Sequence, residues 1–369
     1  MKRPTILLLA ALALGAAHPA AAQSPQPGPD RPVDAATRTA VIDALASALN
    51  EQYIFADKAR EMEASIRQRA RRGEYDALTG SRAFADSLTA HLQAVSHDRH
   101  LRVRFSPEPI PQRRGAPPSP EEIARYRDEA RIGNHGFEKV ERLPGNVGYL
   151  EMRGFAGPEA AGETAAAAMT FLAGTDALII DLRRNGGGSP GMVALVSSYL
   201  FDEPTHLNSL YWRVGDRTEQ FWTLPYVPGR RFGSDKPVYI LTSDRTFSAA
   251  EEFTYNLQNL KRATVVGDTT GGGAHPGGTV RLHEHFGVFV PRGRAVSPIT
   301  GTNWEGTGIR PDVPVPTDHA LQTAYVDALA KVIATLPEGE RKQGLTETLG
   351  NERRKLEEMR GFAGPEAAG

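Results

Sequence analysis

The sequence predicts an α/β protein in which a small helical domain precedes a larger domain built on a mainly parallel sheet. From residue 147 onward, short apolar runs alternate with helical patterns, as in strand–helix units around a parallel sheet. Before residue 97, apolar side chains recur at helical spacing instead, for example at Val41, Leu45 and Leu49. A chain of 369 residues is long enough for one large domain or two ordinary ones.

The first 22 residues resemble a secretory signal peptide. Lys2 and Arg3 precede an apolar stretch over residues 5–17, and Ala20-Ala21-Ala22 offers a cleavage site before Gln23. An uncleaved membrane anchor is the alternative, but the apolar stretch is too short to span a bilayer. We therefore expect a periplasmic or secreted protein without stable membrane insertion.

A flexible, proline-rich leader is expected over 23–32, followed by an N-terminal helical domain over 33–106. Its helices are predicted over about 35–52, 57–72 and 81–95. The strict alternation from His100 to Phe105 then predicts a strand. Residues 107–145 are interpreted as a proline-rich linker and a helix, because 39 residues fall short of the roughly 50 that an independent domain needs.

The α/β core is predicted over 146–320, with C-terminal helices over 321–358. The expected elements are strands 147–152, 177–181, 238–242 and 263–266, helices 158–172, 190–201 and 248–259, a hairpin over 207–224, and a β-rich region over 279–315. Residues 151–162 recur identically at 358–369. The second copy has no evident partner, so 359–369 is interpreted as a duplicated tail without function.

Composition excludes several classes of function. The net charge of −1 argues against a nucleic-acid-binding protein. The chain has no cysteine, which excludes disulfides, thiolate zinc sites and cysteine nucleophiles.

Ser248 is a candidate nucleophile, because it lies where a predicted strand turns into a helix. The helix N-terminus would favour a developing oxyanion, and the amide of Ala249 could donate a hydrogen bond to it. The alternative is structural: Ser248 with Glu251 three residues later has the pattern of a capping box.

The glycine-rich turn over residues 185–191 has three interpretations. Gly186-x-Gly188-x-x-Gly191 formally matches a dinucleotide fingerprint. The acid expected about 20 residues later is missing, and export also counts against this function. The glycines could instead expose amides as an oxyanion hole, or only form a tight turn.

Among the histidines, His100 is a candidate general base if the fold brings it near Ser248. The alternative is that His100 only forms part of a solvated turn between a helix and a strand. His283 and His285 fall on one face of a strand, but no third metal ligand can be recognised for them, so no metal and no cofactor are expected. His275, in a flexible glycine-rich loop, could touch substrate, but solvent exposure is the expectation. Glu305 could orient a histidine, although an exposed loop carboxylate is the commoner fate of a glutamate.

Five segments together resemble the tail-specific, or C-terminal-processing, serine peptidase family. The resemblance is greatest to the branch that includes the repeats of interphotoreceptor retinoid-binding protein and the tricorn protease core. It covers about residues 135–318, and the helical segment ending in Asp98-Arg99-His100-Leu101 resembles the N-terminal domain of that branch. The segments are Leu143-Pro144-Gly145-Asn146-Val147-Gly148-Tyr149-Leu150, Ile179-Ile180-Asp181-Leu182-Arg183-Arg184-Asn185-Gly186-Gly187-Gly188, Thr246-Phe247-Ser248-Ala249-Ala250-Glu251-Glu252-Phe253, Val266-Gly267-Asp268-Thr269-Thr270-Gly271-Gly272-Gly273-Ala274 and Trp304-Glu305-Gly306-Thr307-Gly308-Ile309-Arg310-Pro311-Asp312.

The resemblance implies a ClpP/crotonase-like core that hydrolyses peptide bonds in peptide or protein substrates. It implies that Ser248 is the nucleophile, His100 the base and Glu305 the acid of the charge network. The oxyanion hole would consist of the amide of Ala249 and that of Gly187 or Gly188.

Three departures from the family pattern qualify these expectations. The lysine of the Ser–Lys dyad found in many members is absent from residues 267–278, which favours the histidine. Residues 107–145 leave no room for a PDZ domain. Arg99 replaces the serine that precedes the histidine in the tricorn-like network. Because the retinoid-binding relatives share the scaffold, the alternative function is a non-catalytic binder of hydrophobic ligands or peptides.

Overall fold

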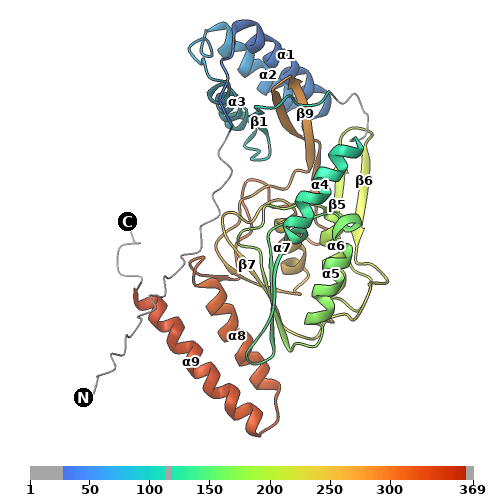
Figure 1. Ribbon diagram of the computed structural model, residues 1–369, viewed down its shortest axis with the longest axis vertical. Coiled ribbons are helices and arrows are strands. Elements are labelled where there is room, and N and C mark those ends of the chain that lie inside the picture. The colour runs from blue at the N-terminus through green and yellow to red at the C-terminus, as the bar shows by residue number, and fades with distance from the viewer. Residues whose placement is uncertain (1–27, 113–118, 363–369) are drawn as a thin grey trace, which may run out of the picture.

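The computed structural model describes residues 28–112 and 119–362. A central sheet with helices on both faces forms the core, and a smaller helical unit lies at one end of it (Figure 1). This arrangement confirms the predicted α/β fold class. The predicted signal peptide, residues 23–27 of the leader and residues 363–369 of the duplicated tail lie outside the described residues.

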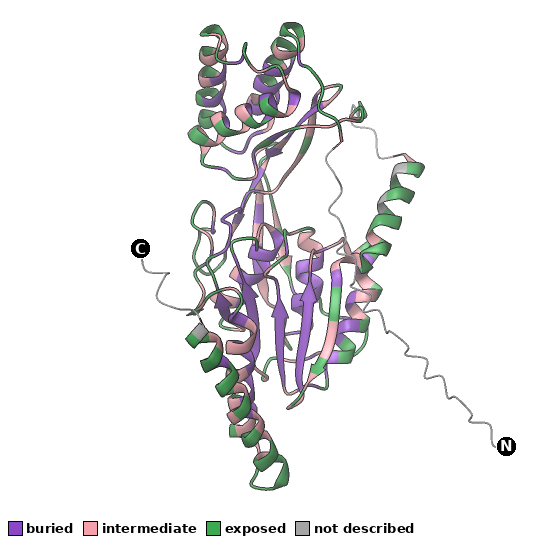
Figure 2. Cartoon of the chain, turned by 60° about the vertical axis from the view of Figure 1, so that its left-hand side comes forward, coloured by how far each residue is buried: buried purple, intermediate pink, exposed green. Residues whose placement is uncertain are grey.

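The central sheet has six strands in the order β12-β8-β7-β4-β3-β2. All neighbouring pairs are parallel except β2 and β3, which are antiparallel. Every residue of β3, β4 and β7 is buried, as expected for parallel strands covered on both faces (Figure 2). The strands are β2 (Phe137–Leu143), β3 (Val147–Met152), β4 (Ala177–Asp181), β7 (Val238–Thr242), β8 (Thr264–Gly267) and β12 (Val313–Pro314).

Two hydrophobic clusters hold helices against this sheet. One cluster packs α5 (Pro158–Leu172), α6 (Pro190–Ser198) and α7 (Ala249–Asn259) on one face. The other packs α8 (Ala320–Thr335) on the opposite face, and α9 (Glu340–Phe362) lies against α8. Both α5 and α6 begin with proline, which is favoured in the first helical turn because its missing N–H needs no partner there.

The N-terminal unit contains three helices and a three-stranded antiparallel sheet. The helices are α1 (Ala35–Gln52), α2 (Ala56–Arg71) and α3 (Ser81–Ser96). Strand β1 (Arg102–Phe105) pairs with β10 (Phe286–Pro291), which pairs with β9 (Gly277–His283). One hydrophobic cluster joins these helices to β1, β9 and β10. The hydrophobic core of the predicted 33–106 domain is therefore completed by a hairpin from much later in the chain (Figure 1).

A second small sheet lies beside α6 and α7. It has the order β11-β5-β6, all antiparallel, with β5 (His206–Trp212), β6 (Arg217–Trp222) and β11 (Gly293–Val296). The β5–β6 turn falls at Gly215 and Asp216, which both have positive φ, and this matches the predicted hairpin.

The segment 107–145 holds more than the predicted linker and helix. Its described part contains α4 (Pro120–Ile132), a short 3-10 helix (Asn134–Gly136) and β2. Strand β2 extends the central sheet at its edge by pairing with β3. Its side chains are mostly charged and only partly buried, so no apolar pattern marks it in the sequence.

Both ends of the described chain also differ from expectation. Residues 28–32 of the predicted flexible leader are held against α3, because Ser81 N donates to Arg31 O at 2.9 Å and Arg82 N donates to Asp30 Oδ1 at 3.1 Å. Helix α9 continues to Phe362, so residues 359–362 of the duplicated tail are helical. Within the described residues, the helices are all too short or too polar to cross a membrane.

Candidate active site

A cavity of about 1280 Å³ lies between the N-terminal unit and the domain built on the central sheet. Its walls come from β1 and β10 of the N-terminal unit, the glycine-rich turn after β4, the start of α7 and the small β11-β5-β6 sheet. Ser248 and His100 both line it. A large concave site with convergent polar groups is the usual setting for ligand binding or catalysis.

Ser248 lies at a strained turn between β7 and α7. Its φ of 57° and ψ of −123° fall in a region that non-glycine residues rarely adopt. Such strain persists only where the surroundings impose it, and it concentrates at functional sites. The Glu251 carboxylate accepts from Ser248 N at 2.9 Å, as one half of the predicted capping box requires.

Glu251 ties this turn to the neighbouring glycine-rich loop. Its fully buried carboxylate also accepts from Thr270 Oγ1 at 2.5 Å, Gly272 N at 2.6 Å and Gly273 N at 2.8 Å. Burial raises the pKa of Glu251, and these hydrogen bonds oppose that rise. From the sequence, Glu251 was expected only to cap the helix. In the structure its carboxylate also holds the loop of residues 270–273 beside Ser248.

Replacing Glu251 by alanine is expected to lower the free energy of unfolding by about 3 kcal/mol or more, because several buried donors lose their acceptor together. Urea denaturation would measure the change. Replacing the exposed Glu347 on α9 is the matched control and should change it by less than about 0.5 kcal/mol. Equal stabilities of the two variants would show that Glu251 does not hold the loop.

Two backbone amides beside Ser248 are open to a ligand. Gly187 N donates to Asn185 Oδ1 at 2.9 Å, so this amide is already engaged. Gly188 N and Ala249 N donate none of the hydrogen bonds found among the described residues. Gly187 and Gly188 have φ of 108° and 145°, and a Cβ on Gly187 would lie 2.7 Å from the Cβ of Ser248. The turn thus brings the backbone close to the Ser248 side chain.

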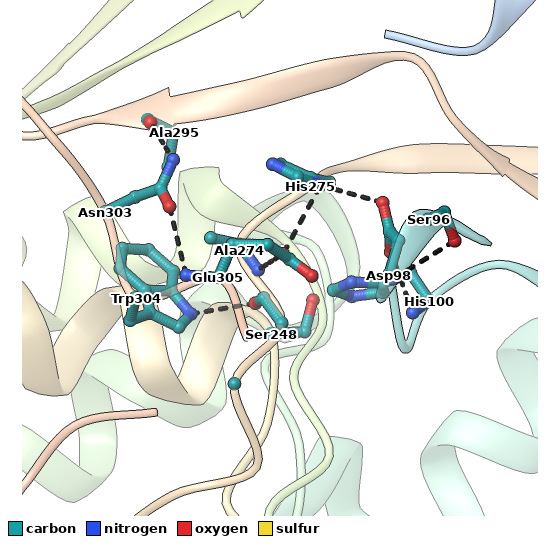
Figure 3. Close-up of polar contacts among 12 residues, drawn as sticks. Ser96, Asp98, His100, Ser248, Ala274, His275, Ala295, Asn303, Trp304 and Glu305 are labelled. Atoms are coloured by element: carbon teal, nitrogen blue, oxygen red, sulfur yellow. Dashed lines mark hydrogen bonds and ion pairs between the residues drawn. The ribbon is translucent and has the colours of Figure 1, made fainter. Parts of the chain in front are cut away.

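His100 follows α3 and comes just before β1. Its ring centroid lies 4.5 Å from that of Phe247 and 5.6 Å from that of Phe289. Burial lowers the pKa of His100 to about 4, and the nearby Asp98 charge opposes the shift. His100 is therefore neutral at pH 7 and able to accept a proton. Figure 3 shows it beside Ser248, although no hydrogen bond between the two side chains is found among the described residues.

The turn that carries His100 is fixed to the glycine-rich loop. Asp98 Oδ1 accepts from His100 N at 3.0 Å, and Arg99 Nη1 donates to Gly271 O at 2.6 Å. The ring of His100 packs on Gly273, where an added Cβ would lie 2.6 Å from His100 Cε1. The loop tied to Ser248 by Glu251 therefore also positions His100.

A second group of ionisable side chains lies behind His100 (Figure 3). His275 Nδ1 is 2.7 Å from Asp98 Oδ2 and 3.4 Å from Glu305 Oε2. Glu305 Oε2 also accepts from Ala274 N at 2.5 Å, and Tyr53 donates its hydroxyl to Asp98 Oδ2 at 3.2 Å. Burial, with the nearby Asp98 charge, raises the pKa of Glu305 to about 7.

This group changes two sequence expectations. His275 is only 5% exposed, so the expectation of an exposed loop histidine was wrong. Among the described residues, Glu305 pairs with His275 and makes no hydrogen bond to His100, and its Oε1 atom is buried without a hydrogen-bond partner. The sequence assigned no role to Asp98, although it lies in the same short motif as His100, and considered His275 only as an exposed residue able to touch substrate.

The same three side chains are the part of the site able to hold a metal ion. The ligand atoms of Asp98, His275 and Glu305 all lie within 4.8 Å of one another. They are also satisfied without an ion if a proton on His275 Nδ1 is shared between the two carboxylates. The pair His283 and His285 belongs to no such group among the described residues.

Comparison with known proteins identifies two family models. The model of peptidase family S41 matches residues 146–315, which include β3 to β12 and Ser248. The model of the N-terminal domain of S41 peptidases in eukaryotic IRBP matches residues 35–131, which include His100.

Two solved structures with TM-scores above 0.5 share the fold, and a third is reported for its similarity alone. A protein from Parabacteroides merdae, reported as a peptidase, is 20% identical with a TM-score of 0.55, over 81% of this chain and 99% of that one. A lipoprotein from Streptococcus agalactiae is 14% identical with a TM-score of 0.52, over 79% and 96% of the two chains. The photosystem II D1 C-terminal processing protease is 18% identical with a TM-score of 0.45, over 78% and 94%. On its two matching family models, the chain belongs to peptidase family S41 and carries the IRBP-type N-terminal domain of that family.

Proposed function

We propose that this protein is an exported serine peptidase that cleaves peptide bonds in peptide or protein substrates, with Ser248 as nucleophile and His100 as general base. One observation carries the proposal: the strained Ser248, the neutral His100 and two unengaged amides surround one cavity. These are the parts that acyl transfer through a serine requires. Membership of family S41 supports the peptidase class.

In the proposed mechanism, Ser248 Oγ attacks the carbonyl carbon of the substrate peptide bond as His100 takes the hydroxyl proton. We assign Nε2 of His100 as the proton acceptor, because Nδ1 is buried without a hydrogen-bond partner. The amides of Gly188 and Ala249 stabilise the oxyanion of the tetrahedral intermediate. His100 then returns the proton to the leaving amine, and a water molecule hydrolyses the acyl-enzyme by the same steps.

Asp98, His275 and Glu305 act as positioning residues in this proposal. Asp98 links both histidines, since it accepts from His100 N through one oxygen and contacts His275 through the other. Glu305 therefore influences His100 through His275 and Asp98, which differs from the direct role expected from the sequence. Export is supported by the composition of residues 1–22, and no cofactor enters the mechanism.

Labelling with a fluorophosphonate, followed by peptide mapping, tests the proposed function. We expect a covalent adduct on Ser248 and cleavage of a mixed peptide library by the unlabelled protein. Cleavage that survives complete labelling would indicate another nucleophile. A folded protein that neither takes the label nor cleaves any peptide would contradict the proposal and favour a non-catalytic binder of hydrophobic ligands.

A further inference from the structure

Glu252 lies on the same face of α7 as Ser248, one turn farther along the helix. It is 5% exposed and lines the same cavity as Ser248. Its neighbour Glu251 is engaged by the glycine-rich loop and by Ser248 N, whereas Glu252 is used by no step of the proposed mechanism. The helical rise places Glu252 about 6 Å along the axis from Ser248.

The polar atoms around Glu252 lack partners. Glu252 Oε1 has no hydrogen-bond partner, and neither side-chain atom of Asn208 or Asn256 has one. Asn208, on β5, interacts with the Glu252 carboxyl and lowers its pKa, and Asn256 follows on the next turn of α7; neither asparagine lines the cavity. The two asparagines are 1% and 2% exposed. Buried polar groups are nearly always paired, so a cluster of unpaired ones calls for a ligand.

The charge of the cluster indicates what that ligand is. Burial raises the pKa of Glu252 to about 8, and no cationic side chain acts on it. The carboxyl is therefore protonated in the empty enzyme at neutral pH, and a cation beside it would stabilise the ionised form. In that form Glu252 offers the cavity two carboxylate oxygens as acceptors.

Part of the cavity wall is apolar. Leu210, Trp212, Phe221 and Trp304 line the same cavity as Glu252. Apolar walls together with a buried carboxyl suit a long side chain with an aliphatic stem and a charged head. Lysine and arginine have this structure.

We propose that Glu252, with Asn208 against its carboxyl, is the acidic group of a substrate subsite that takes a lysine or arginine side chain beside the scissile bond. This inference rests on the proposed peptidase function and adds to it the class of substrate. Binding converts Glu252 to a carboxylate, so close to one proton per site is released when the cation enters at pH 7.

The test uses calorimetry on the Ser248→Ala variant, which makes binding independent of cleavage. The ligands are hexapeptides that carry lysine, norleucine or glutamine at each position in turn. At one position, lysine should bind at least 10-fold more tightly than norleucine, which has a similar aliphatic chain without the charge. Comparison of buffers with different ionisation enthalpies should show release of about one proton.

Adding Glu252→Gln to that variant should abolish both the lysine preference and the proton release. Glu159→Gln is the matched control, because Glu159 is an exposed carboxylate in the same cavity, and it should preserve both. A lysine preference that survives Glu252→Gln would overturn the subsite, as would equal binding of lysine and norleucine peptides or no peptide binding. Should Glu252→Gln fail to fold, the lysine–norleucine comparison decides alone.

The subsite and the peptidase function fail in different ways. A lysine preference in the Ser248→Ala variant, combined with no cleavage by the wild type, would contradict the peptidase function and leave the subsite standing. Cleavage that depends on Ser248 but shows no preference for lysine or arginine would contradict the subsite and leave the peptidase function standing.

Discussion

Replacing Ser248 by alanine is expected to lower kcat/KM for peptide hydrolysis by at least about 10,000-fold, because removing a serine nucleophile leaves only binding and oxyanion stabilisation. The hydroxyl is placed by a backbone that the Glu251 carboxylate holds through Ser248 N. Peptide binding should be nearly unchanged, since the amides of Gly188 and Ala249 remain in place. The measurement is hydrolysis of a fluorogenic peptide, with direct binding measured alongside it.

Ser189→Ala is the control for this experiment. Ser189 also lines the cavity, and its side chain makes no capping hydrogen bond to α6. Its loss should change kcat/KM by less than about 10-fold, or about 1.4 kcal/mol. Retention of hydrolysis in a homogeneous Ser248→Ala preparation would assign the chemistry to another residue.

Replacing His100 by asparagine is expected to lower kcat by about 100- to 10,000-fold, which is the usual contribution of a general base. KM should change little, because the ring packs against Phe247 and Phe289 at one side of the cavity and its proposed role is proton transfer alone. The exposed His97, three residues earlier, supplies the control. Its φ is 58°, a conformation that asparagine tolerates, so His97→Asn should leave kcat unchanged.

The pH profile gives an independent readout of the same residue. Because burial lowers the pKa of His100 to about 4, its neutral form persists well below the ordinary histidine range. For the wild type, kcat/KM should therefore begin to fall only as pH drops toward 4. An acid limb centred near 6.5 would contradict this assignment.

The sequence predicted the core elements well where local chemistry determines them. Helix α5 begins at Pro158 and β4 is an uninterrupted apolar strand, and both have the predicted bounds. Strand β2 was missed because it lies at an edge of the sheet, where charged side chains are tolerated and leave no apolar signature.

In the candidate site, too, the sequence predicted the residues that local motifs mark and not those that depend on long-range contacts. Ser248 and His100 were selected from their local motifs, and the structure places them in one cavity. The surroundings of His275 could not be predicted, because Asp98, Glu305 and the ring of Phe55, 5.4 Å away, come from distant parts of the chain. A glycine-rich loop looks flexible in sequence, and only these long-range contacts bury it.

Two separate hydrophobic cores support the two proposed catalytic residues. Ser248 is carried by the central sheet, whereas His100 belongs to the helical unit, and the β9–β10 hairpin joins the two (Figure 1). The proposed nucleophile and the proposed base therefore depend on separate hydrophobic cores. A substitution that unfolds only the helical unit would leave Ser248 on its sheet and remove His100 from beside it.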